Sequence, residues 1–284
     1  MSIVVTGATG HLGRHVIEGL LEKVPADQIT AVVRDTEKAA GFAARGVKIA
    51  VANYNEPETF GTLLAAGDKV LLISGNEFDK GRVAQHQVVL DAAKAAGVAL
   101  FAYTSAPGTL TAALADDHKG TEKAILESGV PYALLRNGWY NENYTENLAP
   151  VLEYGAVTQA AGDGKVASAA RADYAAAAVA VLTGEGHENK TYELSGDTAW
   201  GFAEYAALVA ERSGKEIVYN AVSVEALTGI LTGAGLPGPL AAILAGVDAS
   251  IEKGELAGTS GDLSRLTGRP TTPVAESIAA ALKG

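Results

Sequence analysis

The stretch that decides the fold is Val4-Val5-Thr6-Gly7-Ala8-Thr9-Gly10-His11-Leu12-Gly13, near the start of the 284-residue chain. A short apolar run leads into three glycines spaced G-x-x-G-x-x-G, and a helical pattern follows. Gly7 permits a tight turn out of a strand, Gly10 lets the backbone approach a pyrophosphate, and Gly13 lets the helix pack closely. The N-terminus of that helix offers N–H groups to phosphates. The pattern predicts a dinucleotide-binding turn, and a glycine-rich connection without a ligand is the alternative.

The end of the second predicted strand, Ala31-Val32-Val33-Arg34-Asp35, indicates which dinucleotide binds. An enzyme that uses NAD usually carries an acidic residue there, which binds the ribose 2′-hydroxyl. The planar guanidinium of Arg34 suits a 2′-phosphate instead. The alternative is that Arg34 only pairs with Asp35 or with a helix face. The residue therefore favours NADP(H).

Short apolar runs alternate with helical segments through the first half of the chain. The expected strands are rich in branched aliphatic residues, as in parallel sheets buried on both faces: 2–6, 29–34, 47–51, 69–73, 99–104 and 132–136. The expected helices are 11–22, 56–65, 83–96 and 119–128. Gly46, Gly97 and Gly129 follow helices directly, as left-handed caps do. This alternation predicts an α/β doubly wound parallel sheet, the Rossmann fold.

The alternation stops near residue 150, which predicts two domains. Residues 1–150 are expected to form the NADP-binding Rossmann domain, and 151–284 a smaller α+β substrate-binding portion across the carboxyl edge of the sheet. Some elements of the second half can rejoin the first domain. Its expected helices are 169–182, 202–212, 224–233, 239–253 and 274–283, and its expected strands are 190–195 and 216–223.

Composition narrows the function classes. The net charge is −11 and the basic residues are scattered, which argues against nucleic acid as a direct partner. The absence of cysteine removes thiolate catalysis and cysteine-ligated metals, and no metal site is expected. No run approaches about 18 apolar residues, so no membrane span is expected. The N-terminus enters a strand at once, which favours a cytoplasmic protein.

Several further runs, with the glycine turn and Arg34, resemble the NmrA-like atypical short-chain dehydrogenases/reductases almost from end to end. The runs are Ala95-Ala-Gly-Val98, Ala102-Tyr-Thr-Ser105, Leu134-Leu-Arg-Asn-Gly-Trp-Tyr140, Ala161-Gly-Asp-Gly164, Arg171-Ala-Asp-Tyr174 and Gly186-His-Glu-Asn-Lys-Thr-Tyr-Glu193. This family includes quinone reductases and triphenylmethane dye reductases. The resemblance therefore implies a dinucleotide-dependent reductase.

The resemblance also implies a set of cofactor-binding residues. The pyrophosphate would lie on the turn formed by Gly7, Thr9, Gly10, His11, Leu12 and Gly13, and the 2′-phosphate on Arg34. The ribose would be lined by Ser74, Gly75 and Asn76. The nicotinamide side would be faced by Asn137, Trp139, Tyr140 and, from the second half, Arg171. Arg34, Ser74, Ser105 and Asn137 all follow predicted strand ends, where open α/β sheets bind ligands.

The acid–base pair of ordinary short-chain dehydrogenases, Tyr-x-x-x-Lys, is missing. Aligned on the helix that ends at Ser128, the lysine position holds His118 and the tyrosine position holds Leu114. Reversible alcohol oxidation is therefore disfavoured. A quinone accepts hydride without an acid on its carbonyl, so quinone reduction needs mainly a planar slot over the nicotinamide, and no flavin.

Three residues are candidates for a catalytic role. His118 is the candidate acid, because Asp116 and Asp117 could raise its pKa; the alternative is a solvated histidine beside a helix cap. Ser105 ends a strand and either binds the substrate oxygen or makes a turn. Tyr140, with Trp139, either forms one wall of the acceptor slot or packs against the second half. His86 is expected to be a partly buried helical residue.

These observations predict an NADPH-dependent oxidoreductase that transfers hydride directly to a quinone. A triphenylmethane-type dye is the alternative acceptor. A second alternative is a redox sensor that binds dinucleotide without catalysis. The expected partner is a small planar acceptor, and the expected state is a monomer or a homodimer.

Overall fold

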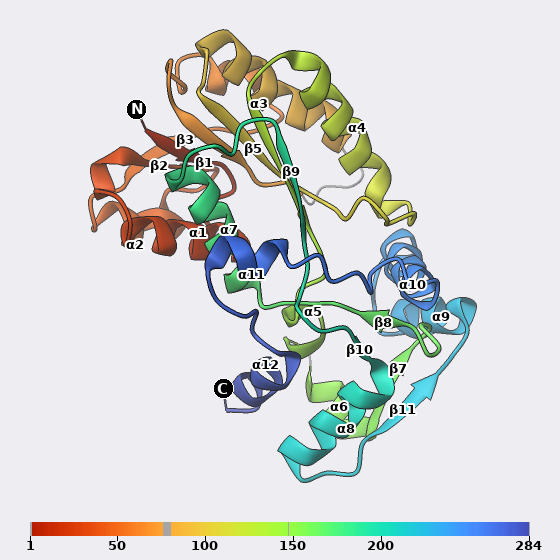
Figure 1. Ribbon diagram of the computed structural model, residues 1–284. Helices are drawn as coiled ribbons and strands as arrows, with labels where there is room; N and C mark the ends of the chain where they lie inside the picture. Colours follow the sequence, from red (N-terminus) through yellow and green to blue (C-terminus); the bar gives the residue numbers. More distant parts are fainter. Residues whose placement is uncertain (1, 76–80, 147, 284) are drawn as a thin grey trace. The chain divides into compact units, whose positions relative to one another are not determined.

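The computed structural model describes residues 2–75, 81–146 and 148–283, which fold into two compact units (Figure 1). The first unit comprises Met1–Ala106, Asp117–Asn137 and Arg171–Tyr192, and the second comprises Pro107–Asp116, Gly138–Ala170 and Glu193–Gly284. The chain therefore passes between the units several times. The expected division was near residue 150, with some later elements rejoining the first domain. The segment 171–192 returns to the first unit.

The first unit is built on a seven-stranded sheet in the order β3-β2-β1-β4-β5-β6-β9. The strands are β1 (Ile3–Val5), β2 (Ile29–Val33), β3 (Lys48–Val51), β4 (Lys69–Leu72), β5 (Leu100–Ser105), β6 (Tyr132–Asn137) and β9 (Lys190–Leu194). Every ladder among β1 to β6 is parallel. This order confirms the predicted doubly wound Rossmann sheet, and β9 extends it at the β6 edge.

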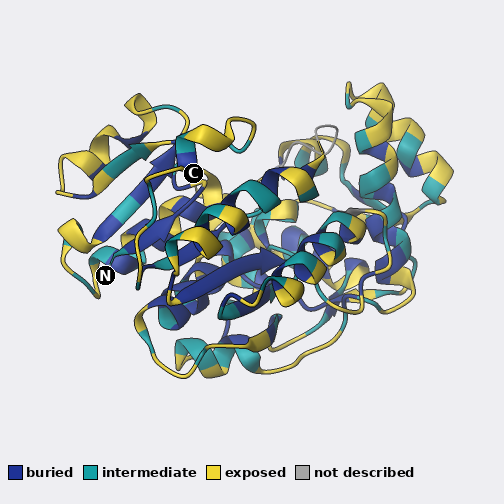
Figure 2. Cartoon of the chain, turned by 90° about the horizontal axis from the view of Figure 1, so that it is seen from above, coloured by how far each residue is buried: buried dark blue, intermediate teal, exposed yellow. Residues whose placement is uncertain are grey.

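Helices cover both faces of this sheet (Figure 1). On one face lie α1 (His11–Leu21) and α7 (Arg171–Thr183), which pack against each other; α7 also contacts β4 and β5. On the other lie α3 (Arg82–Ala96) and α4 (Leu114–Ser128). The inner strands β1, β2, β4, β5 and β6 are largely buried, the edge strands β3 and β9 are more exposed, and the outer faces of the helices are exposed (Figure 2), as expected for a parallel sheet between two layers.

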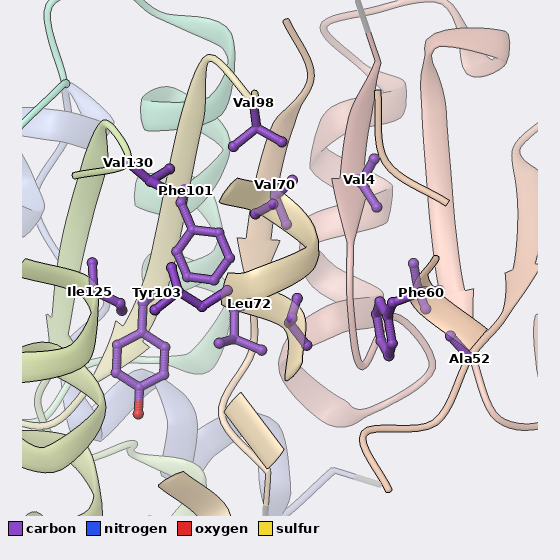
Figure 3. Packing of buried hydrophobic residues seen from close by; sticks show 14 of the residues in the cluster. Val4, Ala52, Phe60, Val70, Leu72, Val98, Phe101, Tyr103, Ile125 and Val130 are labelled. Atoms are coloured by element: carbon purple, nitrogen blue, oxygen red, sulfur yellow. The ribbon is translucent and has the colours of Figure 1, made fainter. Parts of the chain in front are cut away.

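The core under α3 and α4 explains why the strand sequences are so apolar (Figure 3). Phe101 and Tyr103 alternate along β5 and point to the same side, together with Val70 and Leu72 of β4. Ile125 of α4 packs against this layer. Tyr103 differs from its neighbours because it brings a hydroxyl group to the buried interface between sheet and helices.

The predicted helix over 56–65 is wrong. The structure has only a short 3-10 helix there, Pro57–Phe60, followed by turns. Gly61 lowers helical stability at the next position. The Thr59 hydroxyl bonds the Glu56 carbonyl at 2.6 Å, which gives the backbone a local alternative to an α-helix. Three further short helices of this unit were not predicted: 3-10 helices at Ala26–Gln28 and Glu37–Ala39, and α2 (Ala40–Ala43).

The second unit contains two small sheets and several helices, and so has the α+β character that was predicted. β7 (Ala156–Gln159) pairs in parallel with β11 (Val218–Ala221), and β8 (Lys165–Val166) pairs antiparallel with β10 (Trp200–Gly201). Its helices are α5 (Glu142–Thr145), α6 (Leu148–Tyr154), α8 (Phe202–Ser213), α9 (Val224–Gly233), α10 (Gly238–Glu252), α11 (Asp262–Thr267) and α12 (Val274–Ala281). β7, β8, β10, α5, α6 and α11 were not predicted.

Aromatic rings of α5 and α8 surround Trp200 of β10: Tyr144 and Phe202 meet it edge to face, and Tyr205 is stacked on it. Within the described ranges, no helix combines the length and the apolar character that crossing a membrane requires.

Candidate active site

The glycine turn joins β1 to α1 as predicted. A side chain is disfavoured at its three glycine positions for different reasons. Gly7 adopts a φ of +61°, and its carbonyl accepts the Gly10 N–H at 3.0 Å. A Cβ on Gly13 would collide with the Gly7 carbonyl oxygen and the Ala8 backbone. A Cβ on Gly10 would come no closer than 3.2 Å, to the same oxygen. Internal packing therefore requires Gly13 far more than Gly10, which leaves space above Gly10 for a ligand.

The N-terminus of α1 suits a pyrophosphate. Gly10 is the N-cap residue and no side chain caps the helix. The turn itself is braced, because Arg14 Nε donates a 2.9 Å hydrogen bond to the Thr9 carbonyl. Uncapped N–H groups on a braced turn are what an anion site at a helix N-terminus needs.

Arg34 directly follows β2, which lies beside β1 in the sheet. The residue is exposed. The neighbouring Asp35 carboxylate is engaged by the Glu37 N–H at 2.9 Å, and it lies 3.9 Å from Lys38 Nζ. A guanidinium next to the glycine turn fits the 2′-phosphate of NADP(H).

Side-chain hydrogen bonds tie the carboxyl ends of β4 and β5 together. The Ser74 N–H donates to Thr104 Oγ1 at 2.9 Å. The next N–H, that of Gly75, donates to Nε2 of His86 at 3.0 Å. The backbone N–H groups of two of the three residues that were predicted to line the ribose are thus held by side chains. The third, Asn76, lies outside the described residues.

Ser105 belongs to a buried cluster with Glu122 and Arg136. Its hydroxyl donates to Glu122 Oε1 at 2.6 Å. Arg136, which faces Ser105 across the β5–β6 ladder, binds both carboxylate oxygens of Glu122 at 2.9 and 2.6 Å. The Ser105 hydroxyl thus donates to a carboxylate, which is neither of the two roles considered for it, and a bond to the substrate oxygen stays a prediction.

His118 is not solvated and its pKa is not raised, so both of these expectations are wrong. The residue is buried, and its Nε2 and Nδ1 atoms lie 3.0 Å from Arg82 Nη2 and 2.9 Å from the Tyr103 hydroxyl. Burial and the positive charge of Arg82 lower its pKa to about 3. The nearby carboxylates do not raise the pKa, because Asp117 lies 3.8 Å from the Arg82 guanidinium. At neutral pH His118 is therefore uncharged.

Arg171 lies in the second half of the chain and begins α7, which belongs to the first unit. The other end of α7 lies at the amino edge of the sheet, since Lys69 Nζ at the start of β4 donates to the Gly184 carbonyl at 2.7 Å. The N-terminus of α7 therefore points to the carboxyl edge, which also carries the glycine turn. Asn137, the last residue of β6, is buried at that edge.

Trp139 and Tyr140 belong to the second unit and are half-buried there. They lie beside the segment around Ala169, whose N–H donates to the Trp139 carbonyl at 3.3 Å and which forms a parallel bridge with Tyr140. A contact of either aromatic side chain with the nicotinamide stays a prediction.

Sequence reasoning missed Arg82, Tyr103 and Glu122. Two of them had a usable signal, because Arg82 lies four residues before His86 and Glu122 four residues after His118, and such pairs share one face of a helix.

His11 and His15 share the same spacing on α1. Among the described residues, however, no three potential ligands gather to hold a metal ion.

Comparison with known proteins agrees with this geometry. The NAD(P)H-binding family matches residues 7–185. Quinone oxidoreductase 2 of Escherichia coli (strain K12) is 48% identical over 278 residues, which cover 97% of each chain.

Two solved structures are similar over nearly their whole length. A crystal structure of E. coli NADPH-dependent quinone oxidoreductase QOR2 complexed with NADPH has a TM-score of 0.95 at 47% identity, covering 99% of each chain. The triphenylmethane reductase of Citrobacter sp. has a TM-score of 0.94 at 43% identity, covering 100% of each chain. The chain is thus a member of the NAD(P)H-binding family, in the same group as quinone oxidoreductase 2.

Proposed function

We propose that the protein reduces quinones with NADPH by direct hydride transfer, without a flavin. The main support for this proposal is that the residues at the positions where ordinary short-chain dehydrogenases keep proton donors are not set up to donate a proton to a substrate. Leu114 replaces the tyrosine of ordinary short-chain dehydrogenases, His118 is neutral with a pKa of about 3, and the Ser105 hydroxyl donates to Glu122. A carbonyl substrate needs an acid at its oxygen. A quinone does not, because water readily protonates the phenolate that forms.

The residues at the carboxyl edge fit the cofactor part by part. When bound, NADPH supplies a hydride from its nicotinamide ring. The Gly10 backbone and the N-terminus of α1 would hold the pyrophosphate, and Arg34 the 2′-phosphate. Ser74 and Gly75 would line the ribose, with Asn137 on the nicotinamide side. The similarity to a quinone oxidoreductase crystallised with NADPH supports this assignment.

The proposed reaction balances without another redox partner. The quinone gains two electrons and one proton as hydride, and a second proton from water completes the hydroquinone. The chain's own contribution is therefore binding and orientation rather than proton transfer. Since no titrating acid is involved, we expect kcat to change less than about threefold between pH 6 and 8.

Steady-state oxidation of NADPH, followed at 340 nm, tests the proposal. We expect the purified protein, without added flavin, to turn over with benzoquinone or menadione well above the uncatalysed rate. A rate equal to the uncatalysed one with every quinone would contradict the proposal. Tight binding that distinguishes NADP⁺ from NADPH, with no hydride transfer to any acceptor, would indicate a redox sensor instead.

A triphenylmethane dye is the second candidate acceptor, because the Citrobacter reductase is nearly as similar as the quinone oxidoreductase. A cationic dye also accepts hydride without an acid. Decolourisation of crystal violet with NADPH, compared with menadione reduction under the same conditions, separates the two acceptors. We expect a larger kcat/KM for the quinone, and a larger value for the dye would reverse the order of the candidates.

A further inference from the structure

The hydrogen bond from the Gly75 N–H to His86 fixes the protonation of a buried histidine. An amide N–H can only donate, so Nε2 of His86, 3.0 Å away, is the acceptor and carries no proton. His86 lies on α3 with no exposed surface. Burial, reinforced by the charge of Arg82, lowers its pKa to about 3. The ring is therefore neutral, with its single proton on Nδ1.

The Nδ1 proton has a partner of its own. Nδ1 lies 2.9 Å from Thr121 Oγ1, and the Thr121 hydroxyl donates in turn to the Asp117 carbonyl at 2.9 Å. The chain of donors thus runs in one direction, from His86 through Thr121 into the backbone of α4. His86 consequently presents Nε2 to Gly75 as a rigid acceptor, since both ring nitrogens are engaged.

The second buried histidine holds the same interface in place. An Arg guanidinium only donates, so Nε2 of His118 accepts a hydrogen bond from Arg82. The proton of neutral His118 is therefore on Nδ1, which donates to the Tyr103 hydroxyl. The Tyr103 oxygen also lies 3.5 Å from Nδ1 of His86. Helix α3 is thereby fixed to β5 and α4 around His86.

We infer that His86 is a positioning residue for the cofactor, acting through the peptide plane between Ser74 and Gly75. In a trans peptide the Ser74 carbonyl points opposite to the Gly75 N–H. With that N–H turned toward α3, the plane presents a carbonyl acceptor on its other side, where a hydroxyl of the nicotinamide ribose can donate to it. This inference rests on the proposed function, which assigns Ser74 and Gly75 to the ribose.

Two amide substitutions separate the bonds that His86 makes. In H86Q, Oε1 lies as many bonds from Cβ as Nε2 does, so the acceptor for Gly75 is kept and the Thr121 bond is lost. In H86N, the amide nitrogen lies as many bonds from Cβ as Nδ1 of histidine does, and no atom extends to the position of Nε2. The bond to Thr121 is therefore kept and the bond from Gly75 is lost. The variants carry the same chemical group in the same buried place, and each serves as the control for the other.

The readout compares NADPH with its fragment 2′,5′-ADP, which has the 2′-phosphate but lacks the nicotinamide ribose. Equilibrium titrations at 15 °C, with folding verified by circular dichroism, give the dissociation constants. We expect H86N to bind NADPH about tenfold more weakly than wild type, the effect of losing one well-made hydrogen bond. We expect H86Q to stay within about threefold, and 2′,5′-ADP to bind all three proteins equally.

Three outcomes would overturn the inference. The first is an unchanged NADPH affinity in H86N. The second is an equal loss in H86N and H86Q. The third is a parallel loss of 2′,5′-ADP binding, because it would show a general defect of the unit. A wild-type protein that fails to bind NADPH, or that binds it and reduces no acceptor, would count against the proposed function instead.

Discussion

The guanidinium of Arg136 meets both carboxylate oxygens of Glu122, with Nε 2.9 Å from Oε1 and Nη2 2.6 Å from Oε2. The Glu122 side chain is only 9% exposed, and it also accepts the Ser105 hydroxyl. One carboxylate therefore ties the carboxyl ends of β5 and β6 to α4. At this place ordinary short-chain dehydrogenases often keep a catalytic serine, and here the serine hydroxyl donates to Glu122.

Substitution E122Q is expected to lower the free energy of unfolding by about 2 kcal/mol, because it replaces a charged acceptor facing Arg136 with an amide N–H. Urea denaturation at pH 7 measures the loss. The matched control is E18Q, since Glu18 and Arg45 also approach to 2.6 Å but are about half exposed. We expect E18Q to cost less than about 1 kcal/mol. Equal losses in the two variants would show that burial of the pair is unimportant.

Substitution G10A is expected to weaken NADPH binding, and G13A is expected to lower the stability of the fold. G13A places a Cβ against the Gly7 carbonyl and the Ala8 backbone, so we expect a loss of stability of more than about 3 kcal/mol. In G10A the new Cβ lies 3.2 Å from the Gly7 carbonyl oxygen, a tight contact that is far milder than the overlap in G13A, and the Gly10 φ of −73° suits alanine. We expect G10A to keep its melting temperature within a few degrees and to bind NADPH at least tenfold more weakly. Wild-type affinity in folded G10A would place the pyrophosphate elsewhere.

Substitution R34A is expected to reduce the preference for NADPH over NADH. Loss of a charge-assisted bond to the 2′-phosphate corresponds to an increase of about tenfold or more in the KM for NADPH, with the KM for NADH nearly unchanged. R45A, which removes a surface arginine paired with Glu18, is the control and should leave both values unchanged. Parallel changes for the two nucleotides would exclude Arg34 from 2′-phosphate recognition.

The two buried histidines make stability fall in mild acid. Their folded-state pKa values are about 3, against about 6.5 when unfolded, so between these values the unfolded chain binds protons that the folded chain does not. The free energy of unfolding should therefore fall as pH drops below about 6.5, by up to about 1.4 kcal/mol per pH unit for each histidine. Buried Asp248, whose pKa burial raises to about 6, acts in the opposite direction.

Urea denaturation of wild type and H86Q at pH 7.5, 6.0 and 5.0 tests this prediction. H86Q should lose one of the two histidine contributions, so its stability should fall less steeply below pH 6.5, while the two proteins should depend on pH alike above pH 7. Identical slopes throughout would mean that His86 takes up a proton in the folded state as easily as in the unfolded chain.

The sequence alone determined the Rossmann sheet and its dinucleotide turn. Strand burial, the spacing of Gly7, Gly10 and Gly13, and the residue after β2 are local features, because each depends on a few neighbouring residues. The strands predicted in the first half of the chain therefore agree closely with those of the structure, and Gly46, Gly97 and Gly129 adopt the predicted left-handed conformation.

Tertiary structure decided what local patterns cannot encode. α7 is separated by about 150 residues from α1, yet the two helices pack together in the first unit, and local patterns did not indicate which later element returns there. His118 seemed exposed beside two aspartates, but Arg82, 36 residues earlier, lies against it in the core. The pKa of a side chain depends on burial and on charges brought near by folding, and neither is written in its immediate sequence.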